Sequence, residues 1–191
     1  VNERIRLSSA NSINIARLIP QFFYYFKAYK QVAGQGKPVV FSIPSGNFGN
    51  LTAGLMAQKM GLPIEHFIAA TNANDVVPEY LTSGAFTPRP SQRTLSNAMD
   101  VGAPSNFARM LDLYCSTWNN MRRDISGFGF SDTETKQAMR EIKQRYNYII
   151  DPHGAVGYLA LRKYQETHPG HLGVVLETAH PSKFIEDVES I

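Results

Sequence analysis

Residues 39–50 read VVFSIPSGNFGN, an apolar run that ends abruptly in a turn rich in glycine, asparagine and serine. The short β-branched and aromatic run over 39–43 predicts a buried strand. The stretch 51–60 predicts a helix, because Leu51 and Leu55 fall on one helical face and Gly61 can close its C-terminus. The turn therefore joins a strand to a helix.

The composition of this turn is typical of an anion site. Gly46 and Gly49 lack a Cβ atom, so we expect their backbone to take left-handed angles and to let an anion approach the amides. The following helix adds the partial positive charge of its N-terminus. The same residues are also compatible with capping alone, with Asn50 as the N-cap.

Composition limits the class of protein. Of the 191 residues, 43% are apolar and 18% are charged, as in an ordinary soluble globular chain. The net charge of +3 is small and the basic residues are scattered, so nucleic acid is not an expected partner. A lone cysteine, Cys115, excludes an intrachain disulfide and favours a reducing compartment. With no apolar run of membrane-span length and no signal-peptide core, we expect a cytoplasmic protein without a membrane partner.

Strand and helix patterns recur along the rest of the chain. Further strands are expected over 64–71 and 173–177, and helices over 12–32, 77–83, from 105 or 106, 131–145, 155–167 and after Pro181. Ser131 and Glu134 have the spacing of a capping box. The alternation predicts an α/β fold with a parallel sheet covered on both faces.

Ligands of such sheets lie at the carboxyl ends of the strands. Three loops are therefore expected to converge on one site: PSGNFGN after the first strand, TNANDVVP after the second and ETAHPSK after the last. The last loop would bring Thr178, His180 and Lys183 to this site.

The turn does not have the form of a nucleotide site. A Walker loop ends in Lys and then Ser or Thr, whereas Asn50 and Leu51 stand there. A dinucleotide fold has differently spaced glycines and an acidic residue after the next strand, where Thr71 and Asn72 stand. A single compact phosphate is the ligand that remains.

Five segments in order along almost the whole chain resemble threonine synthases. They are ANSINIARLIPQ (10–21), FSIPSGNFGNLTAGLMAQKMGLP (41–63), FIAATNANDVVP (67–78), TLSNAMDVGAPSN (94–106) and TAHPSKF (178–184). The resemblance implies an α/β three-layer sandwich with a mostly parallel sheet. This is the tryptophan synthase β-like fold of pyridoxal-phosphate enzymes (fold type II), present here in part.

The resemblance also implies an activity and a cofactor site. The complete protein would be a lyase of threonine biosynthesis that converts O-phosphohomoserine and water into L-threonine and phosphate. The phosphate of pyridoxal 5′-phosphate would be held by the loop residues Ser45, Gly46, Asn47, Phe48, Gly49 and Asn50. Thr178 would give its hydroxyl to the pyridine nitrogen; a hydroxyl, unlike a carboxylate, does not hold that nitrogen as pyridinium.

Threonine synthases carry their Schiff-base lysine ahead of the segment that matches Val1, and no stretch here resembles that motif. We therefore expect residues 1–191 to be the C-terminal, cofactor-binding portion of the enzyme. This portion would contain no catalytic residue and no metal ligand, and it would be inactive without the N-terminal portion. Lys37 and Lys183 are interpreted as surface residues.

Other interpretations stay open. The chain could belong to another pyridoxal-phosphate lyase such as threonine dehydratase, or it could be a non-catalytic phosphate-binding module. Asn11, Ser12 and Asn14 either cap a helix or border the active-site cleft, and Arg17 meets either the substrate phosphate or a neighbouring carboxylate. His153 and His180 are structural or orienting, whereas Asn72 and Asp75 are expected to form a turn.

Overall fold

The computed structural model of the protein describes residues 14–189 and residue 191. Its strands are β1 (Val39–Pro44), β2 (His66–Thr71), β3 (Ile125–Gly129) and β4 (Leu172–Val175). Its α-helices are α1 (Ile19–Val32), α2 (Gly49–Lys59), α3 (Val76–Ser83), α4 (Phe107–Leu113), α5 (Trp118–Asp124), α6 (Asp132–Tyr146), α7 (Pro152–Gln165) and α8 (Ile185–Glu189). Short 3₁₀ helices are η1 (Ile15–Arg17), η2 (Ala33–Gln35), η3 (Asn97–Met99) and η4 (Pro181–Phe184).

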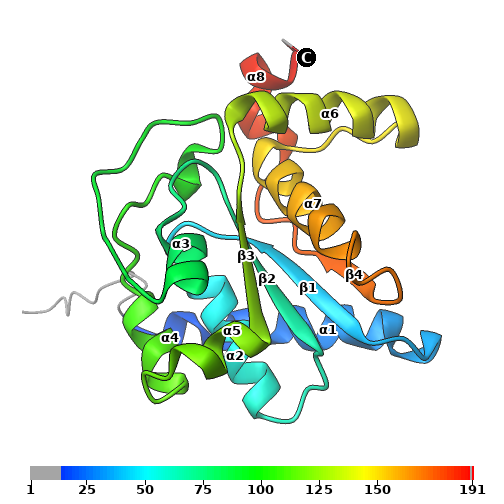
Figure 1. Ribbon diagram of the computed structural model, residues 1–191. Coiled ribbons are helices and arrows are strands. Elements are labelled where there is room, and N and C mark those ends of the chain that lie inside the picture. Colours follow the sequence, from blue (N-terminus) through cyan, green and yellow to red (C-terminus); the bar gives the residue numbers. More distant parts are fainter. Residues whose placement is uncertain (1–13, 190) are drawn as a thin grey trace, which may run out of the picture.

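The described strands form one parallel sheet in the order β3-β2-β1-β4 (Figure 1). In the register, Phe41 of β1 lies opposite Phe67 of β2 and Val174 of β4. The predicted parallel α/β sheet is confirmed, and all carboxyl ends of its strands lie at one edge.

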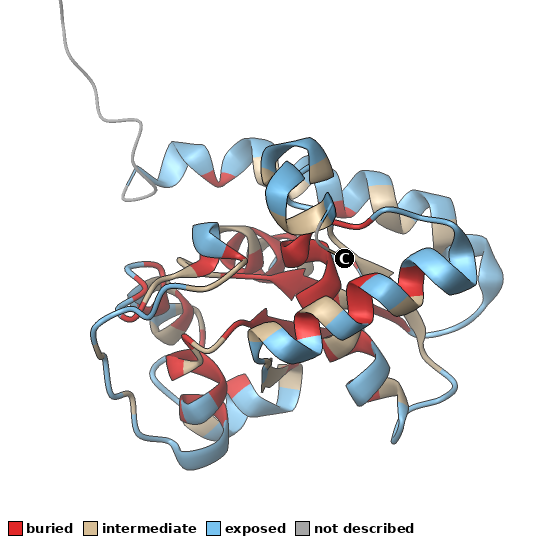
Figure 2. Cartoon of the chain, turned by 90° about the horizontal axis from the view of Figure 1, so that it is seen from above, coloured by how far each residue is buried: buried red, intermediate tan, exposed pale blue. Residues whose placement is uncertain are grey.

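Helices cover both faces of this sheet. Because side chains alternate along a strand, Phe41 and Phe67 point to one face, where they pack with Tyr25 of α1 and with α2. Val40 and Ile68 point to the opposite face and pack against α7. Figure 2 shows burial concentrated in the sheet and on the inward sides of the helices. The three-layer arrangement is therefore present.

The first long helix starts later than the sequence pattern predicted. An η1 turn precedes it, and α1 begins at Ile19 with Pro20 in its first turn. Proline fits the first turn of a helix but would break its interior, so a continuous helix from residue 12 through Pro20 is disfavoured. Residues Asn11 and Ser12 lie outside the described part of the chain.

The other boundaries shift by a few residues. β2 begins at His66 and β4 ends at Val175, so both strands are shorter than predicted. Helix α7 begins at Pro152 instead of 155, because the Asp151 side chain accepts a hydrogen bond from the backbone N–H of His153 and caps the helix. His153 and Gly154 therefore lie inside its first turn.

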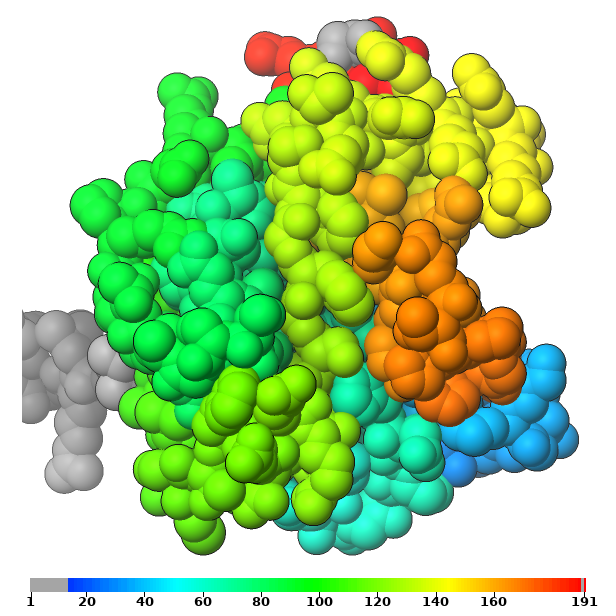
Figure 3. Space-filling view, in the orientation of Figure 1, coloured from blue at the N-terminus to red at the C-terminus, as the bar shows by residue number. Residues whose placement is uncertain are grey.

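The strand β3 and the helix α5 before it were missed by the sequence analysis. β3 has the sequence ISGFG, and two glycines weaken the strand pattern. Both are needed for packing, since a Cβ atom on Gly127 would lie 2.7 Å from Cα of Pro78 and one on Gly129 would lie 2.8 Å from Cβ of Asp75. In Figure 3 this edge strand runs down the middle of the face, between α3 and α7.

Candidate functional site

Two cavities open at the edge where β1 and β4 end. The first, the cleft, has a volume of about 810 Å³, and its lining includes Arg17, Tyr24, Asn47, Gly49, Asn50 and Thr178. The second cavity, of about 420 Å³, is lined by residues that include Gly46, Asn50, Met99, His153, Thr178 and Lys183. Asn50 and Thr178 line both spaces. The predicted convergence of the first and last loops is confirmed.

The backbone of the loop after β1 differs from the prediction. Gly46 and Gly49 do not take left-handed angles; Phe48 does, with φ of 61°. Phe48 also occupies the N-cap position of α2, so the alternative that Asn50 is the N-cap was wrong. The bulky Phe48 can hold this conformation because its side chain is buried in the core.

The two glycines of the loop have different steric roles. A Cβ atom on Gly46 would lie 2.6 Å from Cα of Met99, so this glycine lets the backbone of residues 98–99 come close. A Cβ atom on Gly49 would meet the side-chain nitrogen of Asn106 at 3.4 Å, which is nearly an ordinary contact. Gly46 is therefore required by packing, whereas the fold leaves room at Gly49.

The polar side chains of Ser45 and Asn50 are used to build the loop. Ser45 is buried, its backbone N–H donates to the carbonyl of Ala70, and its hydroxyl donates to Oδ1 of Asn50 at 3.0 Å. Asn50 Nδ2 donates to the carbonyl of Pro44 at 2.8 Å. The Tyr25 hydroxyl donates to the carbonyl of Asn50 at 2.6 Å, and burial raises the pKa of this phenol above its usual range. These hydrogen bonds fix the conformation of the first turn of α2 before any ligand binds.

Asn47 is tied to a segment far along the chain. Its Oδ1 accepts hydrogen bonds from the backbone N–H and the hydroxyl of Ser105, at 2.6 and 3.1 Å. Its carbonyl accepts from Asn106 Nδ2 at 3.0 Å. The segment 104–106 belongs to a stretch that carried the family resemblance, and the sequence analysis gave it only the start of a helix. It supports the loop from the side.

The start of α2 can hold an anion. The first N–H groups of a helix have no intrahelical acceptor. Here the Asn50 side chain accepts from the N–H of Leu51, and Phe48 at the N-cap position supplies no side-chain acceptor for the N–H groups before it. Gly49 and Asn50 border the cleft, where the helix dipole adds partial positive charge, and the guanidinium-bearing Arg17 lines the same space. Backbone donors, an open position at Gly49 and a nearby cation together fit a phosphate group.

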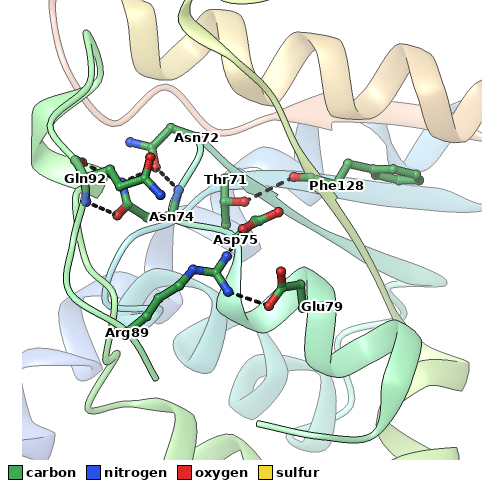
Figure 4. Close-up of polar contacts among 8 residues, drawn as sticks. All are labelled: Thr71, Asn72, Asn74, Asp75, Glu79, Arg89, Gln92 and Phe128. Carbon is green, nitrogen blue, oxygen red and sulfur yellow. Dashed lines mark hydrogen bonds and ion pairs between the residues drawn. The ribbon is translucent and has the colours of Figure 1, made fainter. Parts of the chain in front are cut away.

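The loop after β2 does not reach either cavity, so this part of the predicted convergence was wrong. Asn72 Oδ1 accepts from the backbone N–H of Asn74, which confirms that Asn72 forms a turn. Asn72 and Asn74 also donate to Asp100, at 2.9 and 3.2 Å. Asp75 pairs with Arg89 beside this network (Figure 4). The loop instead anchors residues 94–100, whose η3 turn forms a wall of the second cavity.

The histidines near the site differ in their surroundings. His180 is exposed, and its Nδ1 is bonded to the Ser182 hydroxyl at 2.8 Å, so it shapes its own turn. His153 is buried and lines the second cavity, with Nδ1 at 2.9 Å from Oδ1 of Asp151. Glu177 follows β4 beside this pair. The sequence analysis placed Glu177 in the converging ETAHPSK loop without giving it a role. It did not consider Asp151, which precedes the predicted helix over 155–167.

The two carboxyl groups titrate in opposite directions. Burial and the neighbouring Asp151 carboxylate raise the pKa of Glu177 to about 8. Burial would also raise the pKa of Asp151, but the hydrogen bonds that its carboxylate accepts from His153 outweigh it and lower that pKa below its usual value.

Two further features were sought in the described part of the chain: a metal-binding cluster and a membrane-spanning helix. Residues 14–189 and 191 contain no cluster of three or more side chains suited to a metal ion. None of the helices described there is long and apolar enough to cross a membrane.

Comparison with known proteins identifies related sequences. The family described as pyridoxal-phosphate dependent enzyme matches residues 8–177. The threonine synthase of Serratia marcescens is 47% identical over 193 residues, covering 100% of this chain and 44% of that protein. The Escherichia coli K12 threonine synthase is 48% identical over 187 residues, covering 97% of this chain and 42% of that protein. The chain thus spans less than half the length of these curated relatives.

Solved structures extend the comparison. The crystal structure of Escherichia coli threonine synthase superposes with a TM-score of 0.88 at 47% identity, covering 96% of this chain and 42% of that one. The pyridoxal-phosphate-bound threonine synthase of Brucella melitensis gives 0.88 at 35% identity, with 96% and 44% covered. A threonine deaminase from T.th. gives 0.62 at 18% identity, covering 84% and 57%, which is a likeness of fold alone. The tryptophan synthase β-like fold, present in part, is confirmed.

Proposed function

This chain belongs to the pyridoxal-phosphate-dependent enzymes, and on that basis we propose that it is the C-terminal, cofactor-holding portion of a threonine synthase. One observation carries the proposal: Asn50, in the first turn of α2, and Thr178 border the same two cavities. A ligand with a phosphate at one end and a ring nitrogen at the other can meet both.

The proposed reaction converts O-phosphohomoserine and water into L-threonine and inorganic phosphate. When bound, pyridoxal phosphate supplies an electron sink for the negative charge that develops on the amino-acid carbon. The described residues contribute binding and orientation. Backbone N–H groups between Gly46 and Asn50 would hold the cofactor phosphate, and Thr178 would contact the pyridine nitrogen.

The residues of the loop after β1 have different proposed roles. Gly49 and Asn50 would present the amides at the start of α2, while Phe48 sets the turn that exposes them. The side chains of Ser45 and Asn47 would hold the loop in shape, since both already accept or donate hydrogen bonds within the protein. Arg17, which lines the cleft beside the loop, would attract the phosphate of the substrate.

The proposal includes a further portion of the same protein. The matched relatives are more than twice as long as this chain, and the lysine that would bond the cofactor has no counterpart in the segments that resemble the family. We propose that this portion completes the cleft from the side of α1, and that the enzyme works in the cytoplasm. The complete protein below means this chain together with that portion.

Sequence identity favours threonine synthase over threonine dehydratase. Identity to threonine synthases reaches 48%, whereas the threonine deaminase is 18% identical and supports the fold alone. Both classes would bind the same cofactor, so the product decides between them. A non-catalytic phosphate-binding module would bind the cofactor without forming product.

The test is release of phosphate and threonine from O-phosphohomoserine by the complete protein, with and without pyridoxal phosphate, with residues 1–191 as control. We expect both products only from the complete protein with cofactor. If the complete protein binds the cofactor but releases neither product, the chain belongs to an enzyme with another activity. If the complete protein does not bind the cofactor, the whole proposal is contradicted.

A pair of variants ties the result to the loop. Gly49→Asp places a carboxylate where the cofactor phosphate is proposed to lie, so we expect the dissociation constant for pyridoxal phosphate to rise at least tenfold. Gly49→Ala adds a methyl group that has room, at 3.4 Å from Asn106 Nδ2, and serves as the matched control. Equal affinity of both variants for pyridoxal phosphate would show that this loop does not bind the cofactor phosphate.

A further inference from the structure

Asn106 is a fully buried polar residue beside the loop after β1, and it lines neither of the two cavities. It occupies the N-cap position of α4, yet its side chain does not cap that helix. An asparagine at this position usually accepts a hydrogen bond from the first turn, which stabilises the helix. The side chain of Asn106 instead bonds Asn47 and Arg109. These two contacts therefore decide its role.

The two partners of the Asn106 side chain fix its orientation. Nη1 of Arg109 donates to Oδ1 of Asn106 at 2.6 Å, and Nδ2 of Asn106 donates to the carbonyl of Asn47 at 3.0 Å. A guanidinium group has only donors and a carbonyl only accepts, so the reverse orientation of the amide would lose both hydrogen bonds. The amide dipole thus points its positive end at Asn47, and the permanent charge of Arg109 holds it there.

Both oxygens of Asn47 are occupied by the segment at the start of α4. Its Oδ1 accepts from the N–H and the hydroxyl of Ser105, and its carbonyl accepts from Asn106. Asn47 lines the cleft, whereas Ser105, Asn106 and Arg109 line neither cavity. Oxygen lone pairs repel an anion, so holding both oxygens on this side makes the cleft more favourable for a phosphate.

The carbonyl of Asn47 shares a peptide group with the N–H of Phe48. This peptide bond is trans, so the N–H points opposite to the carbonyl and away from Asn106. Within the described part of the chain it donates to no backbone oxygen. A hydrogen bond to a carbonyl polarises its peptide group and strengthens the N–H as a donor. Asn106 therefore sets both the direction and the donor strength of this peptide group.

We propose that Asn106 and Arg109 are positioning residues for the cofactor phosphate. Asn106 holds the peptide group between Asn47 and Phe48 with its carbonyl turned out of the cleft, and Arg109 acts through Asn106 by fixing its amide. The inference deepens the proposed function and rests on it, since that function brings the phosphate to this loop. The effect is confined to the phosphate end of the ligand, because the ring is proposed to meet Thr178 on another loop.

The experiment compares pyridoxal phosphate with pyridoxal, which has the same ring and no phosphate, on the complete protein. Equilibrium dialysis gives the dissociation constants of both ligands. Arg109→Met removes the charge and the donors but keeps a long side chain, whereas Arg109→Lys keeps the charge and a donor. Arg140→Met, at an exposed arginine of α6, is the matched control. Thermal unfolding of every variant is measured in parallel.

We expect Arg109→Met to weaken the binding of pyridoxal phosphate about fivefold, because the Asn106 amide loses the partner that fixes and polarises it. The affinity of this variant for pyridoxal should stay within about twofold of the unaltered protein, since pyridoxal has no phosphate to position. Arg109→Lys should recover most of the loss, and Arg140→Met should bind both ligands as the unaltered protein does. The ³¹P NMR signal of the bound cofactor should shift in Arg109→Met and return in Arg109→Lys.

A double variant tests whether Arg109 acts through Asn106. Asn106→Ala removes the donor to the Asn47 carbonyl and should weaken the binding of pyridoxal phosphate about tenfold. Adding Arg109→Met to Asn106→Ala should then cause no further loss, because residues in one hydrogen-bond network do not contribute additively. If Asn106→Ala does not fold, the comparison of Arg109→Met with Arg109→Lys decides.

The contrary outcomes are distinct. Equal losses for pyridoxal phosphate and pyridoxal in Arg109→Met would reduce both residues to supports of the fold. An unchanged affinity for pyridoxal phosphate in Arg109→Met, or an equal loss in Arg140→Met, would overturn the proposal. Additive losses in the double variant would show that Arg109 does not act through Asn106. Failure of the unaltered protein to bind pyridoxal phosphate would instead contradict the proposed function itself.

Discussion

The hydroxyl of Ser45 donates a hydrogen bond to Oδ1 of Asn50 across 3.0 Å and ties the end of β1 to the first turn of α2. Asn50 also holds the carbonyl of Pro44 and the backbone N–H of Leu51. The loop is thus preorganised by its own side chains before a ligand binds.

Replacing Asn50 by Ala should disorganise this loop. The Pro44 carbonyl and the Ser45 hydroxyl would lose their partners, which is expected to lower the free energy of unfolding by about 2 kcal/mol. Ser45→Ala removes one bond and should cost about 1 kcal/mol. Urea unfolding measures both, and a smaller loss in Asn50→Ala than in Ser45→Ala would contradict this account.

Alanine at the two glycines of the loop should have unequal effects. Gly46→Ala forces a methyl group to within 2.6 Å of Cα of Met99, and overpacking against backbone should cost at least about 2 kcal/mol. Gly49→Ala has room and lies in the first turn of α2, so its stability should stay within about 0.5 kcal/mol of the unaltered protein. Thermal unfolding compares them, and equal melting temperatures would refute the packing role of Gly46.

Asp100 is expected to stabilise the fold and to take no direct part in the reaction. It accepts hydrogen bonds from the side chains of Asn72, Asn74 and Thr94, and from the backbone N–H of Thr94. Asp100→Ala removes the acceptor of the Thr94 N–H and hydroxyl, whereas Asn72 and Asn74 keep other acceptors, so it should lower the free energy of unfolding by about 2 kcal/mol. The exposed Asp112 on α4 is the control, since Asp112→Ala should change stability by less than about 0.5 kcal/mol. Similar losses in the two variants would argue against a network centred on Asp100.

His66 should make the protein sensitive to acid. Burial, with the nearby His168, lowers the pKa of His66 to about 4, while an unfolded histidine titrates near 6.5. Between these values the unfolded state binds more protons, so stability falls as the pH drops, by at most about 3 kcal/mol in total. His66→Gln can keep a hydrogen bond to Ser126 without titrating, so it should flatten this part of the stability curve.

The measurement for His66 is the free energy of unfolding between pH 7 and pH 4 in both proteins. His180→Gln, at an exposed histidine, is the control and should leave the slope unchanged. Parallel curves for His66→Gln and the unaltered protein would show that another group carries the acid sensitivity.

Features that depend on neighbouring residues could be predicted from the order of amino acids alone. Apolar runs such as 39–43 specify strands that are buried on both faces, and the capping box of Ser131 and Glu134 opens α6 as predicted. The strand-turn-helix unit at 39–59 and the position of Thr178 after β4 followed in the same way. These signals are local, because hydrogen bonds and periodicity within a few residues produce them.

Contacts between distant segments could be found only in the folded chain. Asn47 is held by Asn106, which is 59 positions away, and the left-handed angle falls on Phe48 because its side chain packs in the core. β3 is a strand despite its glycines because α3 and Asp75 pack against them. Asp151, His153 and Glu177 likewise meet only when α7 packs beside β4. Such contacts depend on burial and close approach in three dimensions, which no periodicity along the chain records.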